Sequence, residues 1–566
     1  MSIIGIDLGT TNSLVACYRD HESKLIPNSL GNYLTPSVVS VLENGEIIVG
    51  AAAKERLITN PEITIAAFKR YMGTNKKYQL GRHTFNSTDL SAFVLKSLKA
   101  DAEVYLGECV TEAIISVPAY FNNQQRRATY EAGKLAGLQV ERLINEPTAA
   151  AVAYGMHQKT DEQKLLIFDL GGGTFDVSIL EIFEDILEIC AVAGDNFLGG
   201  EDFDECLIKY FCEMHNLNLD RLPIDTLVTL KKQAEKSKIA LTLSNSATMV
   251  CRFKDQVLET TITETIFESI AGELLLKLKN PLLKALKDSN NKTNDLDDII
   301  LVGGSSKMPI IRNLVTKMFG RFPLVQINPD EVVGIGIGIC AGIKERHEAL
   351  KEKVLTDVCP YTLGTAVVTE NQFGEQADGI FFPIIERNTT IPYSKVDRLY
   401  NAVDNQKKIK VAVYQGESRL VENNLKLGEL MIKIPPAPKG QSAIDVRYTY
   451  NIDGILEVEV TSVQSGLKKS IVLCNSDTNL TDDQIAVRLK ELEKIKIHPR
   501  DQVHNCYLLE KAERLYEESL AETRMLIAKH IEYFSAVLDR QKPKEIEIAI
   551  QEMENFLSQL EAGDFI

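Results

Sequence analysis

IGIDLGTTNS at residues 4–13 and LIFDLGGGTFDV at residues 166–177 share one sequence pattern. Each runs from an apolar β-type stretch through an aspartate into a tight turn of glycine and threonine, and then into a second apolar stretch. Glycines let backbone N–H groups approach a phosphate closely, and an aspartate at a strand end can hold a hydrated Mg²⁺. Either segment alone has an equally weighted alternative, a simple tightened β-turn. The two together predict a pair of hairpins that clamp the polyphosphate of a nucleotide.

A third glycine segment, LVGGSSK at residues 301–307, follows an apolar stretch and precedes a helical pattern. Such a turn can receive a nucleoside or a phosphate at the start of a helix, and a plain strand-to-helix loop has equal weight. Residues 336–341, GIGICA, match a dinucleotide-binding fingerprint only formally, because they follow residues 328–331 and not a strand and turn. We expect these glycines to let a helix pack closely against neighbouring backbone.

Composition limits the class of protein. The chain has 566 residues, 44% hydrophobic and 25% charged, which is material for three or four globular domains. Its net charge of −16 argues against nucleic acid or an anionic membrane as a partner. Ten cysteines without a close pair favour buried free thiols in a reducing cytoplasm. The longest uncharged apolar run, residues 332–343, is too short to span a bilayer, and the start of the chain does not read as a signal peptide.

The first part of the chain, residues 1–352, alternates β-like runs with helical patterns. Residues 113–117 and 299–302 read as buried strands, and residues 225–243 and 263–286 have helical periodicity. This alternation predicts an α/β domain.

The character of the sequence changes twice after that. Residues 353–357 read as a short linker, and residues 358–478 show short alternating runs with frequent turn signals, typical of an antiparallel β-sandwich. Residues 479–566 favour helix, open with a capping sequence at 481–484 and predict a small α-helical subdomain. The strands expected in the second part are 408–414, 430–434, 443–450, 456–461 and 469–473.

The motifs, taken in order, resemble those of one family. They are IDLGTTNS, VPAYFNNQQR (117–126), INEPTAAAVAYG (144–155), FDLGGGTFDVS (168–178), LGGEDFD (198–204), VGGSSKMP (302–309), INPDE (327–331), NTTIP (388–392), PAPKG (436–440) and DGILEV (453–458). By these motifs the chain resembles the DnaK family of 70 kDa heat-shock chaperones, and most of all its shorter bacterial HscC-type branch, which lacks the long acidic tail of DnaK.

The resemblance implies a multidomain fold: an α/β actin-like two-lobed ATPase domain, an antiparallel β-sandwich that holds extended apolar peptide, and a small α-helical lid. It implies ATP and ADP with Mg²⁺ as ligands, and K⁺ as a further candidate. Hydrolysis would switch the peptide site from weak to tight holding. The implied partners are unfolded or extended polypeptide clients, a J-domain co-chaperone and a nucleotide exchange factor. We expect a cytoplasmic, largely monomeric protein.

The resemblance also assigns site residues. Catalytic roles fall to Lys69, Glu146, Asp169, Thr174 and Asp176, and Asp7 and Asp169 would hold Mg²⁺ through water. From the residues alone, Lys69 and Glu146 would be expected at the surface. The nucleotide-binding positions are Asp7, Thr10, Thr11, Asn12, Gly172, Gly173, Thr174, Gly200, Glu201, Glu235, Lys238, Thr242, Gly303, Gly304, Ser305, Lys307 and Asp330.

Two more groups of residues lie outside the nucleotide site. Pro118 and Arg126 match the family's relay between the catalytic site and the interdomain surface, and three positions match contacts of the J-domain: Arg142, Asn145 and Asp357. Ile409 matches the centre of the peptide pocket, and its expected neighbours are Val368, Leu399, Ala402 and Val411. For Leu399 and Val411, ordinary sandwich core has equal weight.

The chain departs from the family pattern at several positions. Lys307 stands where the family has an arginine that stacks on adenine, and lysine lacks the planar guanidinium. Residues 353–357 read KVLTD, with two aliphatic residues where the family has four, and residues 244–263 form a shorter stretch. Residues 364–388 form a longer one, with an insertion near 370–375. We therefore expect weaker interdomain coupling, faster nucleotide release and little dependence on an exchange factor.

Two other classes of protein share the phosphate hairpins. A metabolic kinase of the actin and sugar-kinase superfamily would leave the second and third parts of the chain unexplained. An actin-like filament protein would need a self-association surface. The sequence motifs of P-loop enzymes, zinc proteases and serine hydrolases are absent from the chain, and its eight histidines are scattered.

Overall fold

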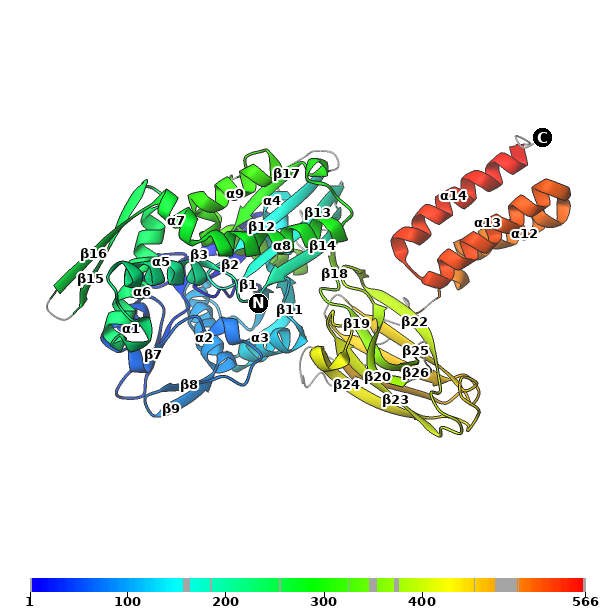
Figure 1. The fold of residues 1–566 in the computed structure, drawn as a ribbon, viewed down its shortest axis with the longest axis horizontal. Helices are drawn as coiled ribbons and strands as arrows, with labels where there is room; N and C mark the ends of the chain where they lie inside the picture. Colours follow the sequence, from blue (N-terminus) through cyan, green and yellow to red (C-terminus); the bar gives the residue numbers. More distant parts are fainter. Residues whose placement is uncertain are drawn as a thin grey trace.

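The computed structural model describes most of the chain. Lys353, the insertion at 371–375 and the capping sequence at 481–484 lie outside the described residues. The elements fall into an N-terminal unit (residues 3–345), a β-unit (358–473) and a helical unit (498–562), as Figure 1 shows. The described residues are 3–155, 163–183, 186–253, 256–324, 326–345, 354–370, 376–451, 454–473, 496 and 498–562.

The first sheet of the N-terminal unit is built on the first glycine-rich hairpin. Its strands are β1 (Ile3–Asp7), β2 (Asn12–Arg19), β3 (Glu22–Ile26), β4 (Thr35–Pro36), β10 (Glu112–Val117) and β11 (Gln139–Asn145). β1 and β2 pair antiparallel, with Asp7 opposite Leu14, and β10 pairs parallel with β1 on its other side. Its order is β11-β10-β1-β2-β3, with β4 on β2.

The second sheet repeats this plan on the second hairpin. Its strands are β12 (Gln163–Leu170), β13 (Phe175–Phe183), β14 (Ile186–Asp195), β17 (Asp298–Val302), β18 (Val354–Val358) and β21 (Thr390–Ile391). β12 and β13 pair antiparallel, with Asp169 opposite Asp176, and β17 pairs parallel with β12. In both sheets a hairpin is therefore flanked by a parallel strand on one side and an antiparallel strand on the other.

Helices α4 (Glu146–Gly155) and α10 (Val332–Lys344) belong to one core cluster that takes side chains from both sheets. The glycines of α10 make this packing possible. A Cβ at Gly336 would stand 1.8 Å from the carbonyl oxygen of Ala149 in α4, and a Cβ at Gly5 in β1 would stand 2.6 Å from the backbone of Ile337. The expectation that residues 336–341 let a helix approach neighbouring backbone is confirmed.

The remaining elements of the N-terminal unit cover these sheets and form its rim. On the side of the first sheet they are β5 (Val39–Val41), β6 (Ile47–Val49), α1 (Ala51–Thr59), η1 (Pro61–Ile63), β7 (Thr64–Ile65), η2 (Phe68–Tyr71), β8 (Lys77–Leu80), β9 (His83–Asn86), α2 (Ser87–Leu106) and α3 (Asn123–Leu135). On the side of the second sheet they are α5 (Gly200–Met214), η3 (Leu219–Arg221), α6 (Ile224–Ala240), β15 (Ser246–Phe253), β16 (Gln256–Thr263), α7 (Glu264–Ile270), α8 (Gly272–Asp288), η4 (Thr293–Asp295), η5 (Gly304–Lys307) and α9 (Pro309–Phe319).

The single helical pattern expected over 263–286 is wrong in detail. Thr263 ends β16, and its hydroxyl accepts the N–H of Ile266 at 3.3 Å, which caps α7. α7 then ends at Ile270, and α8 starts at Gly272, a residue of low helix propensity. Two helices therefore share one apolar face, which is why the periodicity runs through the break.

The segment read as a linker forms strand β18. It pairs parallel with β14, with Glu188 opposite Thr356, and antiparallel with β21, with Asp357 opposite Ile391. β18 thereby joins the second sheet next to β14, so the segment that connects the two units is itself part of a sheet of the N-terminal unit.

The β-unit contains two four-stranded sheets, of order β20-β19-β23-β24 and β22-β25-β26-β27. Leu363, Val413, Val446 and Val458, two from each sheet, are buried in a common core. The strands are β19 (Leu363–Glu370), β20 (Gln376–Ile385), β22 (Tyr393–Tyr400), β23 (Lys408–Gln415), β24 (Leu425–Lys433), β25 (Ala443–Tyr450), β26 (Leu456–Ser462) and β27 (Lys468–Leu473), with a short turn η7 (Val421–Asn423).

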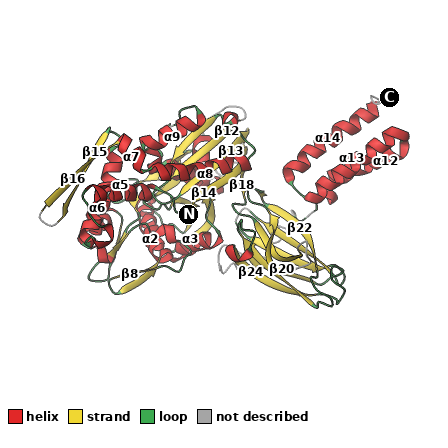
Figure 2. Cartoon of the chain, in the orientation of Figure 1, coloured by secondary structure: helices red, strands yellow, loops and turns green. Residues whose placement is uncertain are grey.

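The helical unit contains η8 (Pro499–Asp501), α12 (Val503–Glu518), α13 (Ala521–Arg540) and α14 (Pro543–Ala562) around its own apolar core. Figure 2 shows the change from strands to helices between the β-unit and this unit. The turn between α13 and α14 contacts the edge strand β22: the side-chain amide of Gln541 donates to Val396 O at 2.9 Å and accepts the N–H of Val396 at 3.2 Å.

Within the part of the chain that the structure describes, no helix has the length and apolar character needed to cross a membrane. Nine cysteines there are free thiols, six of them buried, in agreement with the expectation from their spacing.

Candidate functional site: two phosphate loops around a buried lysine

The first loop connects β1 to β2 and is held tightly by its own side chains. Gly9 N–H donates to Ser13 Oγ at 3.1 Å, and Ser37 Oγ donates to Gly9 O at 2.8 Å. A Cβ at Gly9 would stand 2.0 Å from the carbonyl oxygen of Asn12. Only glycine fits this position, so the loop can bring its backbone N–H groups together as an anion site requires.

The second loop connects β12 to β13 and is braced by the start of α5. The N–H groups of Gly200 and Glu201 donate to Gly171 O and Gly172 O, both at 2.9 Å. A Cβ at Gly199 would stand 2.5 Å from the nitrogen of Gly173. The motif at 198–204 thus packs directly on the loop at 171–174.

The two loops meet. A Cβ at Gly172 would stand 1.9 Å from Thr11 Oγ1, and a Cβ at Gly173 would stand 2.8 Å from Thr10 Cγ2. The two hairpins that the sequence indicated therefore face each other across a distance that only glycine allows.

A buried ion pair lies beside these loops. Lys69, at 3% exposure in η2, places its Nζ 2.9 Å from Oε1 of Glu146 at the start of α4. The expectation from the residues alone, that both are surface charges, is wrong. A lysine is buried in this way only with partners.

Three aspartates surround this pair. Ser116 Oγ donates to Asp7 Oδ1 at 2.6 Å, and Tyr120 N–H donates to Asp176 Oδ1 at 3.1 Å. Burial raises the pKa of Asp7 to about 7 and that of Asp176 to about 8, and the charge of Glu146 adds to both. Burial, followed by the charge of Glu146, also raises the pKa of Asp169 well above its usual range.

This group of carboxylates fits a hydrated magnesium ion. Asp7, Asp169 and Asp176 supply only oxygen atoms, the donors that Mg²⁺ prefers, and their raised pKa values mean that a cation would be stabilised among them. Among the described residues, no three acidic, histidine or cysteine side chains lie close enough to ligate one ion directly. That Asp7 and Asp169 hold Mg²⁺ through water stays a prediction.

The residues assigned to the nucleoside side are engaged with one another in the second half of the N-terminal unit. Lys238 Nζ donates to Gly200 O at 2.8 Å and to Asp204 at 2.7 Å, and Lys307 Nζ contacts Asp330. Glu235 pairs at 3.0 Å with Lys54 of α1 and so crosses from one half of the unit to the other.

The turn after β17 completes this side. Gly303 has a φ of +79°, and a Cβ there would stand 2.4 Å from Leu170 O. Gly304 lies against Asp330. Ser305 lies against Gly200, because a Cβ added at Gly200 would stand 2.2 Å from Ser305 Oγ. Thr242 follows the end of α6, and its hydroxyl lies 3.5 Å from Lys238 O.

Sequence reasoning missed Arg70. Its guanidinium donates to Glu201 at 3.2 Å, to Asp202 at 3.1 Å and to Phe197 O at 2.7 Å. It therefore ties η2 to the start of α5, next to both phosphate loops. The signal that the sequence offers is its position next to Lys69, and its acidic partners are evident only in the structure.

The relay residues form one hydrogen-bonded chain. Arg126 Nη2 contacts Asn145 Oδ1, and Asn145 Nδ2 donates to Asp357 Oδ2 at 2.6 Å. Arg126 Nε also donates to Phe121 O at 3.1 Å, and Pro118 O accepts the N–H of Phe121 at 3.1 Å. Pro118 and Arg126 therefore hold the loop whose Tyr120 N–H reaches Asp176.

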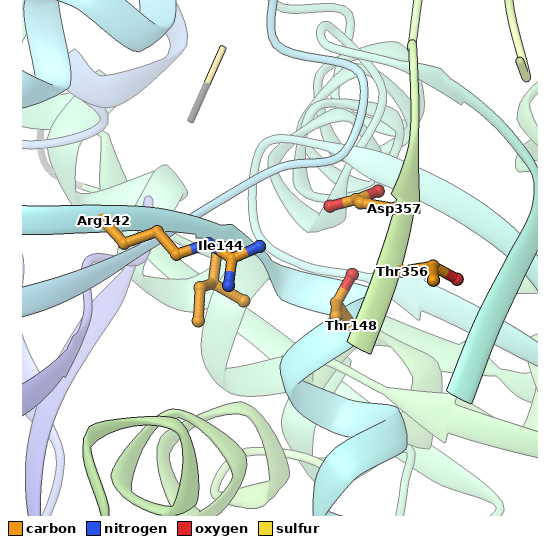
Figure 3. A pocket seen from close by; sticks show the side chains of 5 residues that line it. All are labelled: Arg142, Ile144, Thr148, Thr356 and Asp357. Atoms are coloured by element: carbon orange, nitrogen blue, oxygen red, sulfur yellow. The ribbon is translucent and has the colours of Figure 1, made fainter. Parts of the chain in front are cut away.

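Arg142 belongs to the same place. Figure 3 shows Arg142 and Ile144 of β11, Thr148 of α4, and Thr356 and Asp357 of β18. These five residues line a small cavity of about 10 Å³. Arg142, Asn145 and Asp357 thus lie together, as their common assignment requires.

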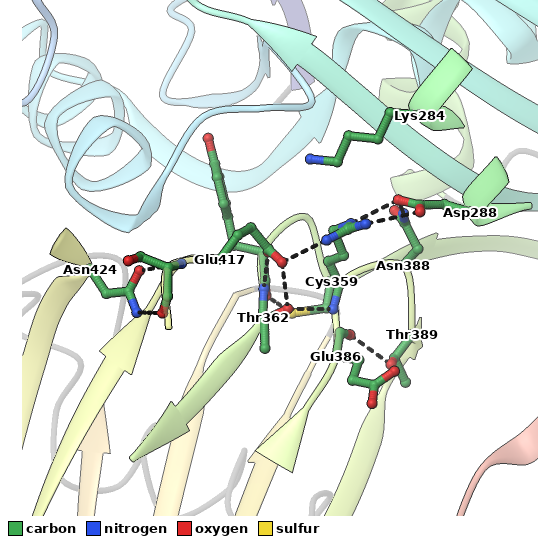
Figure 4. Close-up of polar contacts among 12 residues, drawn as sticks. Lys284, Asp288, Cys359, Thr362, Glu386, Asn388, Thr389, Glu417 and Asn424 are labelled. Carbon is green, nitrogen blue, oxygen red and sulfur yellow. Dashed lines mark hydrogen bonds and ion pairs between the residues drawn. The ribbon is translucent and has the colours of Figure 1, made fainter. Parts of the chain in front are cut away.

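The β-unit also contacts the N-terminal unit through ion pairs (Figure 4). Arg387 binds Asp288 of α8 in a bidentate pair, at 2.7 and 2.9 Å, and binds Glu417 at 2.7 Å. Asn388 Nδ2 donates to the same Asp288 at 3.0 Å.

The residues assigned to the peptide pocket differ in exposure. Val368 of β19 is 41% exposed, and Leu399, Ala402 and Ile409 are half-buried. Val411, 1% exposed, lies in the core between the two sheets, and this favours the structural alternative for that residue.

Comparisons with known proteins agree with this architecture. The family described as Hsp70 protein matches residues 3–564. The chain is 42% identical over 507 residues to the Chaperone protein DnaK of Thermotoga petrophila and to that of Thermotoga maritima. Each of these alignments covers 87% of this chain and 83% of the relative. It is 43% identical over 486 residues to the Chaperone protein DnaK of Thermotoga neapolitana, which covers 83% and 80%. The chain belongs to the Hsp70 family of ATP-dependent chaperones, which are ATPases.

Proposed function

We propose that ATP hydrolysis in the N-terminal unit controls the binding and release of extended, apolar segments of unfolded polypeptide in the β-unit, with the helical unit as a lid. The proposed domains are an actin-like ATPase domain over 1–352, a linker over 353–357, a β-sandwich peptide-binding domain over 358–478 and an α-helical lid over 479–566. A metabolic kinase or a filament protein would have no use for the last two. Within the family, we propose the HscC-type branch, which the chain as a whole resembles most.

In the ATPase domain, the backbone of the two glycine loops and Thr10, Thr11, Asn12 and Thr174 would hold the phosphates. When bound, ATP supplies the phosphoryl group and Mg²⁺ neutralises its charge. Lys69 is fixed by Glu146 at the place where the two loops meet, and it would orient the γ-phosphate and the attacking water. Asp176 would accept a hydrogen bond from that water. Catalysis would then depend on positioned charges and not on a covalent step.

One observation carries the coupling: the chain of hydrogen bonds from Arg126 through Asn145 to Asp357. Arg126 holds the loop next to Asp176, and Asp357 lies in the strand that leads into the β-unit. A change in the position of β18 would therefore change the position of the loop at Tyr120 and Phe121, which contacts Asp176. A J-domain co-chaperone that binds at Arg142, Asn145 and Asp357 would act on the same chain of contacts.

Other assignments follow from the same scheme. Ile409 would form the centre of the peptide pocket, with Val368, Leu399 and Ala402 near it. Lys307 would hold adenine less firmly than an arginine, so an exchange factor would have a small role. K⁺ is proposed as a further ion beside Mg²⁺. The free cysteines of the described residues suit the reducing cytoplasm, where we propose that the protein works.

The proposal is tested by ATP-triggered peptide release. A fluorescent Leu-rich peptide is bound to the full chain, and its anisotropy is followed after addition of ATP and Mg²⁺, in the wild type and in Asn145→Ala. Release should be rapid in the wild type and slowed about tenfold or more in the variant, because the charge-assisted contacts of Asn145 with Arg126 and with Asp357 are both lost. Asn44→Ala, at an exposed asparagine, is the control. No ATP-triggered release from the wild type would contradict the proposed function.

A further inference from the structure

The β-unit also contacts the N-terminal unit through Tyr361, a residue outside the nucleotide site, the relay and the peptide pocket. Tyr361, between β18 and β19, donates its hydroxyl hydrogen to the carbonyl oxygen of Tyr120 at 2.7 Å. The two rings lie 4.5 Å apart, tilted by 39°. Tyr361 also borders a cavity of about 270 Å³ shared with Asn122 and Gln415. The hydroxyl bond and the ring contact with Tyr120 therefore both hold this side chain.

Tyr120 is held from several sides. Its carbonyl also accepts Asn196 Nδ2 at 2.9 Å, and its own hydroxyl accepts Lys284 Nζ at 2.9 Å. Its N–H donates to Asp176 Oδ1 at 3.1 Å. A single residue thus connects a hydroxyl of the β-unit to a carboxylate of the nucleotide site.

The loop around Tyr120 has a second contact with the β-unit. Asn123 N–H donates to Gln415 Oε1 at 3.0 Å. Arg126 binds the same loop from within the N-terminal unit, at Phe121 O. The position of the loop therefore depends on whether the β-unit is docked.

Asp176 faces this loop. Because one of its oxygens is engaged by Tyr120 N–H, the carboxylate is held toward the interdomain surface while the loop is fixed. Burial raises the pKa of Tyr361, so its phenol keeps its proton and remains a donor at neutral pH. The restraint is present whenever the two units are in contact.

We propose that Tyr361 is a positioning residue that restrains Asp176 while the β-unit is docked and frees it when a bound polypeptide separates the units. This inference rests on the proposed function and adds to it a specific contact by which clients would accelerate hydrolysis. Tyr361 touches neither the phosphate loops nor the nucleoside side, so its effect should fall on the rate of hydrolysis and not on ATP binding.

The test uses the full chain as wild type, Tyr361→Phe and Tyr361→Leu, with Tyr400→Phe as control because Tyr400 is exposed on β22. Three quantities are measured: the dissociation constant for ATP, the single-turnover hydrolysis rate without polypeptide, and amide hydrogen exchange in peptides that cover residues 119–122. In Tyr361→Phe the exchange at these amides and the hydrolysis rate should each rise about fivefold, the ratio expected for one lost neutral hydrogen bond. ATP affinity should stay unchanged. Tyr361→Leu should show the same changes, equal or larger.

Unchanged exchange and an unchanged or slower hydrolysis rate in Tyr361→Phe would overturn the inference. So would an effect confined to Tyr361→Leu, because it would assign the role to the ring and not to the hydroxyl. A wild type that binds and hydrolyses ATP while these variants behave normally contradicts only the role of Tyr361. A wild type that neither hydrolyses ATP nor releases peptide contradicts the proposed function itself.

Discussion

Asn145 Nδ2 donates a hydrogen bond of 2.6 Å to Asp357 Oδ2, and this bond joins β11 of the first sheet to the strand that leads into the β-unit. Burial raises the pKa of Asp357, and the nearby charges of Arg126 and Arg142 counteract this increase. Burial of β18 therefore disfavours the charged carboxylate, and the two arginines and the hydrogen bond from Asn145 offset part of this cost. The docked strand and the loop beside the nucleotide site form one polar network.

Thr356→Leu should strengthen this docking. Thr356 is half-buried, its Oγ1 makes only a long hydrogen bond, 3.3 Å, to Leu187 O of β14, and in Figure 3 its side chain points away from Arg142 and Ile144. A leucine adds apolar area worth about 1 kcal/mol when partly buried. ATP-triggered release of a labelled peptide, followed by stopped flow, should therefore become faster and more complete.

Thr356→Val is the matched control, because it removes the hydroxyl without adding length. If Thr356→Leu releases peptide as the wild type does, apolar contact at this position does not limit coupling.

Lys69→Ala should bind ATP but hydrolyse it slowly. The backbone of the two glycine loops survives the change, whereas the charge that we propose orients the γ-phosphate is lost. The single-turnover rate should fall by about 10² to 10³, with the dissociation constant for ATP changed by less than about tenfold. Lys96→Ala, at an exposed lysine of α2, is the control. Hydrolysis at the wild-type rate would remove Lys69 from the mechanism.

Asp176→Asn should stabilise the nucleotide-free protein in a way that depends on pH. The pKa of Asp176 rises from 3.8 to about 8 on folding, so the folded state binds the proton more tightly. The wild type therefore loses stability as pH increases between these two values. The variant lacks this loss and keeps an oxygen that accepts Tyr120 N–H.

The melting temperature of Asp176→Asn relative to wild type should therefore increase from pH 5 to pH 8.5, by the equivalent of about 1–3 kcal/mol. Asp404→Asn, at an exposed aspartate, should show no such trend. A difference in melting temperature that is constant across this range would mean that Asp176 stays ionised in the folded protein.

Ile409→Phe should weaken peptide binding. Ile409 is half-buried on β23, so a larger ring would fill the space proposed for a client side chain. The dissociation constant for a labelled Leu-rich peptide should increase about tenfold, with basal ATPase unchanged. Met431→Phe, at an exposed apolar residue of the adjacent strand β24, serves as the control. Equal affinity in both variants, with the fold intact by circular dichroism, would place the pocket elsewhere.

Lys307→Arg should slow the release of ADP. Lys307 is paired with Asp330 and offers adenine a flexible ammonium, whereas arginine can stack on the ring with a planar guanidinium. Dissociation of fluorescent ADP should slow by up to about tenfold. Rapid wild-type release that the arginine does not slow would show that adenine stacking does not set the rate.

The sequence was most informative where local chemistry and backbone geometry coincide. The two hairpins could be predicted because Asp, Gly and Thr stand at fixed places between apolar runs, and each hairpin became the centre of a sheet. The close approach of α10 could be predicted from Gly336 and its neighbours for a similar reason.

Contacts between distant segments could not be predicted in this way. No local pattern indicates that Lys69 is buried against Glu146, or that Arg70 meets Glu201 and Asp202, because such pairs depend on how two halves of the unit come together. The segment around Thr356 reads as a linker because a strand at a sheet edge gains its stability from β14, far away in the sequence. Tyr361 carries no motif, and its role follows only from the contact with Tyr120.

The central claim is that polypeptide binding in the β-unit controls hydrolysis in the N-terminal unit. The most direct test is the single-turnover rate of ATP hydrolysis by the full chain, measured with and without a reduced, carboxymethylated protein as an unfolded client, in wild type and in Ile409→Phe. The account predicts a saturable, several-fold acceleration in the wild type and little acceleration in the variant. An equal rate with and without the client, in a wild type that binds both ATP and the client, would contradict it.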